Sequence, residues 1–311
     1  MKITDTMWHG FKAISLESKR IRVVMVPQLG AKIVSMYDKT SQYEWLVPPM
    51  RAVKELTYGA TFVEQDMSGW DEMMPTINAC EFDGVFLPDH GEVWSIPWKI
   101  ISLKGQVTLA VDGTAMPYRI TRKATLSADH CLTLHYELEN LGSKSMPYLW
   151  AAHPQFNADP QTRIVFPPEV SVVLNIIDHD PIWGAVETPV DWPNATAADG
   201  RTWQLDRVRG VEHRACRKFY IMPEQPISWA ALQHEGLGCE VRLSWSPMDL
   251  PYLGLWIDEG VHSAVPVAAL EPCSGYFDSL KKAASKQRVT ILEPGERKSW
   301  SLQIRFEEIL G

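Results

Sequence analysis

Apolar and polar residues alternate along much of the chain, and this period of two is typical of half-buried β-strands. The segment CLTLHYELEN places on one face the apolar residues Leu132, Leu134, Tyr136 and Leu138. The segment SWSLQIRFEE repeats the pattern with Trp300, Leu302, Ile304 and Phe306. We therefore expect two long strands whose apolar faces point into a core.

Further strands are predicted by the same pattern and by the turn residues between apolar runs. RIRVVMVPQLGAKIVSMYD reads as two strands joined at residues 27–30, and RVTILEPGERKSW reads as a hairpin with a Glu-Pro-Gly-Glu turn. QVTLAVDG, YRITRKATLS and CEVRLSW are other candidate strands. No stretch keeps a helical period over three turns, and VKELTYGATF is at most one short helix. The pattern predicts an all-β fold, a large antiparallel β-sandwich.

No sign of a domain boundary is visible along the chain. It has neither an internal repeat nor a Gly/Ser-rich or charged linker. A chain of 311 residues can bury one large core. We expect residues 1–311 to form a single β-sandwich domain.

Composition narrows the choice of partners. The net charge of −8 argues against a nucleic-acid partner, which favours a basic face. The longest apolar run, Ala264–Leu270, is too short to span a bilayer, and the opening MKITDTMWHG lacks the apolar core of a secretory signal. Five cysteines without a Cys-x-x-Cys pair indicate reduced thiols. These features predict a cytoplasmic protein without a membrane partner.

Several common catalytic motifs are absent from the sequence. There is no phosphate-binding glycine loop, no Gly-x-Ser-x-Gly elbow and no His-Glu-x-x-His helix. Nucleotide enzymes, serine hydrolases and zinc proteases therefore have little support. We expect neither a cofactor nor a metal ion.

Four loop segments instead bring together polar and aromatic residues. MSGWDEMMPTI holds Trp70, Asp71 and Glu72, and LPDHGEVWSIPW holds His90, Glu92 and Trp94. LWAAHPQFN holds His153 and Asn157, and LEPCSGYFDSL holds Glu271 directly after the apolar run AVPVAAL.

Two interpretations of His153 and Glu271 follow from these contexts. A carboxylate at the end of a buried strand is costly unless it is paired or used in chemistry. Glu271 is thus either a loop cap that accepts backbone N–H groups or a functional carboxylate. His153 is either a core histidine with backbone partners or a proton donor at the rim of a sheet.

The four segments, in this order, resemble those of the aldose 1-epimerase (galactose mutarotase-like) family. AAHPQFN is similar to the family's segment around its catalytic histidine, and ALEPCSGYFDS to the segment around its catalytic glutamate. LPDHGEVW resembles its His-Gly substrate-binding segment, and SGWDEMMPTI the region before it. LPYLGLWIDEG and LEPGERKSWSLQI resemble its late strands, so the resemblance runs from about PQLGAKI to the end.

The resemblance implies a galactose mutarotase-like supersandwich and a sugar mutarotase without a cofactor. Glu271 would be the base that removes the proton of the anomeric hydroxyl, and His153 the acid that protonates the ring oxygen. His90 would bind a sugar hydroxyl or the ring oxygen, Trp70 and Trp94 would form walls, and Asn157 and Asp71 would contribute to substrate binding.

The sequence also departs from the family's pattern. The branch that acts on phosphorylated hexoses has an arginine soon after the His-Gly pair, whereas this chain reads His-Gly-Glu-Val-Trp. Since phosphate favours a bidentate arginine, we expect an unphosphorylated aldose or derivative. Glu92, Asp71 and Glu72 would suit neutral hydroxyls, or alternatively a divalent cation. Lys218 or Glu212 takes the place of an aspartate that many members have.

Two other classes of function remain open. One is a non-catalytic carbohydrate-binding or sensory module that keeps the fold and the cleft. The other is a different sugar-active enzyme, a lyase or a hydrolase, because a fold does not fix a reaction. A hydrolase would need a second carboxylate across the bond, which Asp71 or Glu92 could supply.

Overall fold

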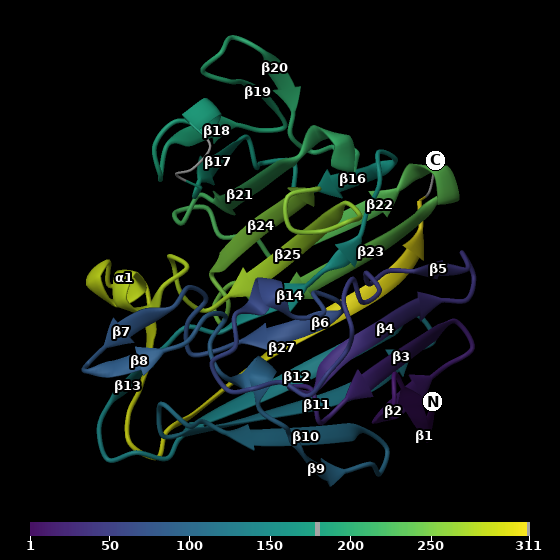
Figure 1. The fold of residues 1–311 in the computed structure, drawn as a ribbon, viewed down its shortest axis with the longest axis vertical. Coiled ribbons are helices and arrows are strands. Elements are labelled where there is room, and N and C mark those ends of the chain that lie inside the picture. The colour runs from purple at the N-terminus through teal and green to yellow at the C-terminus, as the bar shows by residue number, and fades with distance from the viewer. Residues whose placement is uncertain (178–180, 310–311) are drawn as a thin grey trace.

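Two large antiparallel sheets dominate the fold (Figure 1). The structure is a computed structural model, and it describes residues 1–177 and 181–309. Within these residues, the first sheet has thirteen strands. Eleven of them form its main path, in the order β1 (Lys2–Trp8), β2 (Phe11–Glu17), β3 (Ile21–Val26), β4 (Lys32–Asp38), β6 (Trp70–Met73), β14 (Ala151–Pro154), β25 (Val267–Cys273), β24 (Tyr252–Glu259), β21 (Ala215–Ile221), β17 (Val172–Asn175) and β18 (Pro189–Asp191). Off this path, β5 (Tyr43–Glu44) pairs with β4, and β15 (Phe156–Asn157) pairs with β25.

The second sheet has eight strands and lies against one face of the first. Its order is β16 (Thr162–Val165), β22 (Trp229–His234), β23 (Cys239–Trp245), β27 (Arg297–Glu308), β12 (Cys131–Asn140), β11 (Tyr118–Ala128), β10 (Val107–Asp112) and β9 (Lys99–Ser102). Three two-stranded sheets complete the β-structure: β7 (Cys80–Phe82) with β8 (Val85–Leu87), β13 (Met146–Tyr148) with β26 (Thr290–Leu292), and β19 (Asn194–Thr196) with β20 (Thr202–Gln204).

Helical structure is sparse. Within the described ranges, the single α-helix is α1 (Leu280–Ser285), beside β7 and β8 (Figure 1). Five short 3₁₀ helices are η1 (Phe62–Glu64), η2 (Val93–Ser95), η3 (Pro181–Trp183), η4 (Val211–His213) and η5 (Glu235–Leu237). The prediction of an all-β, antiparallel sandwich is therefore confirmed, with the galactose mutarotase-like topology considered below.

The alternation of apolar residues predicted the core-facing side of β12 and β27 correctly. The eight apolar residues named for these two segments are all buried in the core between the sheets. The two strands also pair directly, with Leu134 opposite Leu302. The turn at residues 27–30 joins β3 to β4 as expected, and β10, β11 and β23 occupy the other predicted strand segments.

One local prediction was wrong. RVTILEPGERKSW contains two strands, but β26 pairs with β13 rather than with β27. The partners of β27 are instead β12 and β23, because its long apolar face completes the centre of the eight-stranded sheet. The segment VKELTYGATF, expected to form at most one short helix, runs as an irregular loop whose last residue, Phe62, begins η1.

One buried ion pair joins the two sheets across the core. Arg122 on β11 donates to Glu72 on β6 over 2.7 Å, and Tyr136 donates its hydroxyl to the same carboxylate oxygen over 2.8 Å. Both charged side chains are buried. Removing one partner of such a pair leaves an uncompensated buried charge, which typically costs about 3–5 kcal/mol. Glu72 is thus an element of the core.

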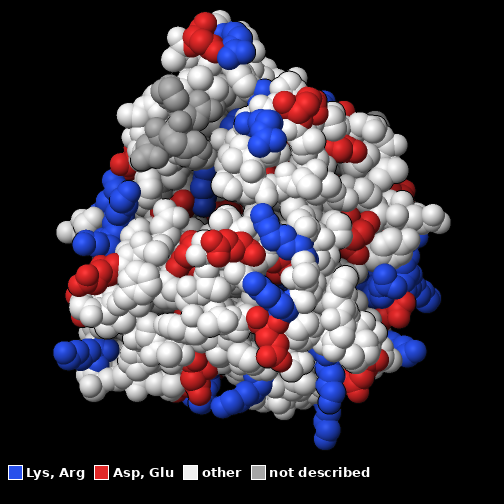
Figure 2. Space-filling model, in the orientation of Figure 1, with Lys and Arg blue, Asp and Glu red and all other residues white. Residues whose placement is uncertain are grey.

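The helices and the charged surface side chains bear on whether the protein could contact a membrane or a nucleic acid. In the described residues, no helix has the length and apolar character needed to cross a membrane. On the face drawn in Figure 2, uncharged surface predominates, and basic side chains stand singly or close to acidic ones.

Candidate active site

A pocket of about 330 Å³ lies on the face of the thirteen-stranded sheet that points away from the eight-stranded sheet. Side chains alternate between the two faces of a strand. Ala152 and Leu270 face the core between the sheets, whereas their neighbours His153 and Glu271 face the pocket. β6, β14, β25, β24 and β21 each contribute residues to its floor, so strands from separate parts of the chain build one surface.

Glu271 lies buried in the floor of this pocket, on β25. The residue opposite it on β24 is Gly254. A Cβ atom at Gly254 would come within 2.9 Å of Glu271 Oε2. The glycine therefore leaves the space across which the carboxylate extends toward β21.

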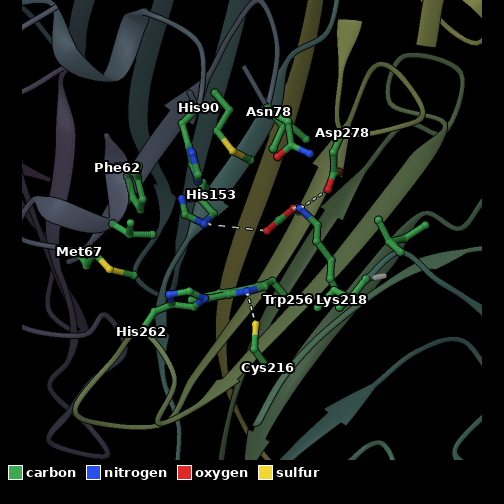
Figure 3. Close-up of a pocket in the computed structure, with 16 residues that line it drawn as sticks. Phe62, Met67, Asn78, His90, His153, Cys216, Lys218, Trp256, His262 and Asp278 are labelled. Atoms are coloured by element: carbon green, nitrogen blue, oxygen red, sulfur yellow. Dashed lines mark hydrogen bonds and ion pairs between the residues drawn. The ribbon is translucent and has the colours of Figure 1, made fainter. Parts of the chain in front are cut away.

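Lys218 on β21 holds two carboxylates together (Figure 3). Its Nζ lies 3.0 Å from Glu271 Oε2 and 3.0 Å from Asp278 Oδ2. The other oxygen of Asp278 accepts a hydrogen bond from the Tyr220 hydroxyl over 2.6 Å. One ammonium thus pairs with two buried carboxylates, while Tyr220 fixes the orientation of Asp278.

His153 faces Glu271 from the neighbouring strand β14. Its Nε2 lies 4.0 Å from Glu271 Oε1. Three aromatic rings surround it, with centroid distances of 5.0 Å to Phe62, 5.1 Å to His90 and 6.2 Å to Trp256. These rings restrict the rotation of the imidazole and keep Nε2 directed toward the carboxylate.

His90 is positioned by a tight loop that follows β8 and packs against Met74, the residue after β6. Gly91 packs directly on Met74, where a Cβ atom would overlap the Met74 carbonyl, so only glycine fits there. His90 itself has a left-handed φ of 59°. Its ring stacks on Phe62 at 4.1 Å, and its Nδ1 lies 2.9 Å from Asp89 Oδ1. The contact with Asp89 occupies Nδ1 and leaves Nε2 for a ligand.

Burial shifts the pKa values of the facing pair in opposite directions. Removal from water raises the pKa of Glu271, although Lys218 opposes the rise. Burial lowers the pKa of His153 well below its usual range, and the charges of His90 and Lys218 lower it further. For Lys218, burial acts to lower the pKa, but Asp278 and Glu271 outweigh it and raise the value. The free pocket therefore favours a neutral imidazole and a charged lysine.

The structure brings together four of the residues singled out from the sequence. His90, His153, Lys218 and Glu271 all line the pocket. Glu212, the alternative to Lys218, is exposed on η4 and lies beside His213. Lys218 is therefore the residue that stands next to the glutamate.

Four other predicted substrate contacts do not line the pocket. Trp70 is buried between the two sheets, since it faces the opposite side of β6. Asp71 is buried beside Lys32. Asn157 donates to the carbonyl of Glu44. Trp94 donates its indole N–H to the Asp89 and Gly91 carbonyls, so it supports the loop of His90.

Glu92, Asp71 and Glu72 were expected to bind sugar hydroxyls or a cation, but each of them interacts with different residues of the protein. Glu92 accepts hydrogen bonds from the hydroxyls of Tyr118 and Tyr58 and from two backbone N–H groups, and Glu72 is paired with Arg122. Neither Glu92 nor Asp71 can therefore serve as the second carboxylate of a hydrolase in this pocket. Within residues 1–177 and 181–309, no group of three or more His, Cys, Asp or Glu side chains could hold a metal ion.

Trp256, Asp278 and Phe62 are among the contributors to the pocket that sequence reasoning missed. Trp256 on β24 forms a wall and donates its N–H to Cys216 Sγ over 3.1 Å (Figure 3). Asp278 pairs with Lys218, and Phe62 from η1 stacks on His90. A signal existed for Asp278, which follows Glu271 in the segment LEPCSGYFDSL. Phe62 follows an irregular loop, where neither the helical nor the strand period indicates which side chains are buried.

Comparison with known proteins identifies the family of this chain. The family model described as aldose 1-epimerase matches residues 12–173, just over half of the chain. The chain belongs to the aldose 1-epimerase family. A search of curated protein sequences finds no match.

Solved structures show that the fold of this aldose 1-epimerase family member is widespread. A galactose mutarotase-like protein from Clostridium acetobutylicum matches with a TM-score of 0.73 at 15% identity, over 99% of both chains. One from Lactobacillus casei matches with a TM-score of 0.68 at 19% identity, over 95% of this chain and 100% of that one. A galactose mutarotase related enzyme from Lactobacillus acidophilus matches with a TM-score of 0.67 at 13% identity, over 96% and 98%. At these identities the likeness establishes the fold, and the chemistry rests on the pocket itself.

Proposed function

We propose that the protein is a sugar mutarotase that interconverts the anomers of an unphosphorylated aldose or a derivative of one. The observation that carries the proposal is the pairing of Glu271 and His153, 4.0 Å apart on the floor of one pocket. A carboxylate and an imidazole at this spacing can address two oxygens attached to the same carbon. Membership of the aldose 1-epimerase family supports the assignment.

The proposed reaction moves two protons and breaks one ring bond. Glu271 accepts the proton of the anomeric hydroxyl as the bond between C1 and the ring oxygen breaks, which leaves an aldehyde at C1. The ring oxygen takes a proton from His153 Nε2. After the aldehyde turns about the C1–C2 bond, the ring recloses with both proton transfers reversed. Each positioned group contributes roughly 10²–10⁴-fold to such a reaction.

The remaining lining residues are suited to an uncharged sugar. Trp256 offers an apolar ring face, and Asn78, His90 and Asp278 offer polar atoms for hydroxyl groups. Among the described residues that line the pocket, Lys218 is the one Lys or Arg, and two carboxylates already occupy it. A phosphate group would find no free cation there. These features support an unphosphorylated substrate.

The test is polarimetry of freshly dissolved aldoses, run beside calorimetric titrations of the same sugars and of their methyl glycosides. We expect faster mutarotation of at least one aldose, together with unchanged methyl glycosides, since these lack the anomeric hydroxyl proton. Cleavage of a methyl glycoside would indicate a hydrolase instead. Binding of several sugars without acceleration of any would indicate a carbohydrate-binding module.

Lys218→Met is expected to move the acid limb of the rate–pH profile to higher pH. Lys218 lowers the pKa of Glu271, so its loss raises that pKa further and keeps the base protonated over a wider range. The measurement is the mutarotation rate between pH 4 and pH 9, with the exposed Lys281→Met on α1 as the matched control. An unmoved acid limb in Lys218→Met would contradict the pairing of Lys218 with the catalytic base.

A further inference from the structure

A buried polar layer lies beside His153, on the side of β6, and has no place in the reaction described so far. Its members come from β4, from the loop before β6, and from β6 itself. Lys32 Nζ lies 2.7 Å from Asp66 Oδ1 and 3.4 Å from Asp71 Oδ2, and Ser68 donates to the other oxygen of Asp66. All four side chains are buried. Asp66 therefore balances Lys32, while Asp71 stands at the longer distance.

Asp71 and His153 are direct neighbours across two strands. They are paired residues in the antiparallel ladder of β6 and β14. Paired residues project from the same face of a sheet, with Cβ atoms about 4.5–5.5 Å apart. Met73 and His153 both line the pocket, so the side chain of Asp71, two residues before Met73, starts on that same face. The Asp71 carboxyl group is thus within reach of the imidazole, directly or through one water molecule.

Both neighbours carry buried polar atoms without a partner. Within the described residues, His153 Nδ1 and Asp71 Oδ1 make no hydrogen bond, and the amide of Gln155 makes none either. Buried polar groups in folded proteins are nearly always hydrogen-bonded, to protein or to water. Gln155 lies two residues beyond His153 along the chain. The unpartnered atoms therefore gather on the side of His153 that faces away from Glu271.

The proposed reaction requires a proton at Nδ1 of His153, on the side of the ring that faces away from Glu271. His153 is held in its neutral form by burial and by the charges of His90 and Lys218, which lower its pKa. A neutral imidazole that gives up its Nε2 proton would become an imidazolate unless Nδ1 gains a proton at the same time. Two titratable side chains face His153 inside the pocket: Glu271 lies on the Nε2 side, and the ring of His90 lies 5.1 Å away with its own Nδ1 against Asp89. The buried polar layer beside His153 offers a further donor to Nδ1.

We propose, on the basis of the proposed function, that Asp71 is a proton-holding positioning residue that supplies Nδ1 of His153 when Nε2 protonates the ring oxygen. Asp71 loses its carboxyl proton to Nδ1, and His153 passes its Nε2 proton to the sugar, so the imidazole changes tautomer and stays neutral. Glu271 becomes protonated in the same step. The negative charge moves from Glu271 to Asp71, beside Lys32, and it returns when the ring recloses.

The environment of Asp71 suits this role. Burial raises the pKa of Asp71 to about 7, and the charges of Asp66 and Glu72 add to the rise, while Lys32 opposes it. Near neutral pH, a large fraction of Asp71 therefore carries the proton that Nδ1 needs. Lys32 then stabilises the carboxylate formed during the reaction.

The test compares Asp71→Asn with the unmodified full chain. An asparagine keeps the size and can still donate a hydrogen bond to Nδ1, but it cannot transfer a proton. We expect kcat to fall by about 10²–10⁴-fold with KM changed by less than about threefold. The control is Glu240→Gln, a buried carboxylate on β23 of the other sheet, which should leave both constants unchanged. A wild-type kcat in Asp71→Asn would overturn the proposal.

The pH profile of the unmodified protein tests the same step without any substitution. We expect the rate to fall as the pH rises through about 7, because Asp71 then lacks its proton. A rate that stays constant from pH 7 to pH 9 would overturn the proposal. The alkaline fall should be absent from the residual activity of Asp71→Asn.

Nitrogen NMR of the histidine rings separates this inference from the mutarotase assignment. In the unmodified protein, the Nδ1 shift of His153, assigned with His153→Phe, should titrate with Asp71, and in Asp71→Asn this titration should vanish. A protein that accelerates no sugar but shows the coupling would disprove the proposed function and retain the Asp71–His153 hydrogen bond. The absence of coupling would overturn the inference even if the enzyme is active.

Discussion

Glu271→Gln is expected to slow mutarotation by about 10²–10⁴-fold while sugar binding changes little. Glutamine has nearly the same shape as glutamate, but it cannot accept the proton of the anomeric hydroxyl. The side chain still fits the space opposite Gly254, and Lys218 keeps its contact with Asp278. The loss should therefore appear in kcat far more than in KM.

The measurement for Glu271→Gln combines polarimetric kinetics with calorimetric sugar titration and circular dichroism. Glu240→Gln on β23 controls for the loss of a buried carboxylate outside the pocket. We expect both variants to fold, because a neutral amide side chain on the pocket floor needs no charge partner of its own. A Glu271→Gln enzyme with an undiminished rate would show that another group is the base.

His153→Phe is expected to cause a loss of similar size, and the two losses should not add. Phenylalanine keeps a ring among Phe62, His90 and Trp256, so the packing around the pocket floor persists without an N–H donor. Glu271 and His153 act in one coupled transfer of protons. The double variant should therefore be about as slow as either single variant.

The double variant also distinguishes one coupled step from two independent contributions. Independent groups would multiply their effects, so the double variant would be slower than each single variant by the full factor of the other. His135→Phe on β12 of the other sheet is the matched control for replacing a histidine ring. Fully multiplicative losses would contradict the coupled acid–base pair.

Strand positions could be predicted from the sequence because alternation reports which face of a strand is buried. The apolar sides of β12 and β27 follow directly from this rule. The pairing of β26 with β13 could not be predicted, since it joins segments more than 140 residues apart. Two consecutive strands joined by a favourable turn sequence look like a hairpin, whether or not they pair with each other.

Sequence patterns report local burial but not long-range pairing, and this also explains which pocket residues could be predicted from the sequence. His153 and Glu271 stand out because a polar side chain in a buried strand demands a partner, and Lys218 supplies one of them. Trp70 was misplaced because a tryptophan gives no local sign of which face it occupies. Its neighbour Asp71 faces the other side of β6, where it is buried beside Lys32 and does not line the pocket. The face of a four-residue strand depends on contacts that only the folded sheet reveals.

Exchange NMR between the α and β anomeric protons of an aldose that binds the pocket tests the central claim most directly. The sugar is at equilibrium, so the exchange rate reports ring opening and closure and nothing else changes in the sample. We predict that the rate rises in proportion to the concentration of the unmodified protein and returns to the buffer value with the Glu271→Gln, His153→Phe double variant. Exchange as slow as in buffer for every sugar that binds, or equal acceleration by the double variant, would contradict the assignment of this pocket as a mutarotase site.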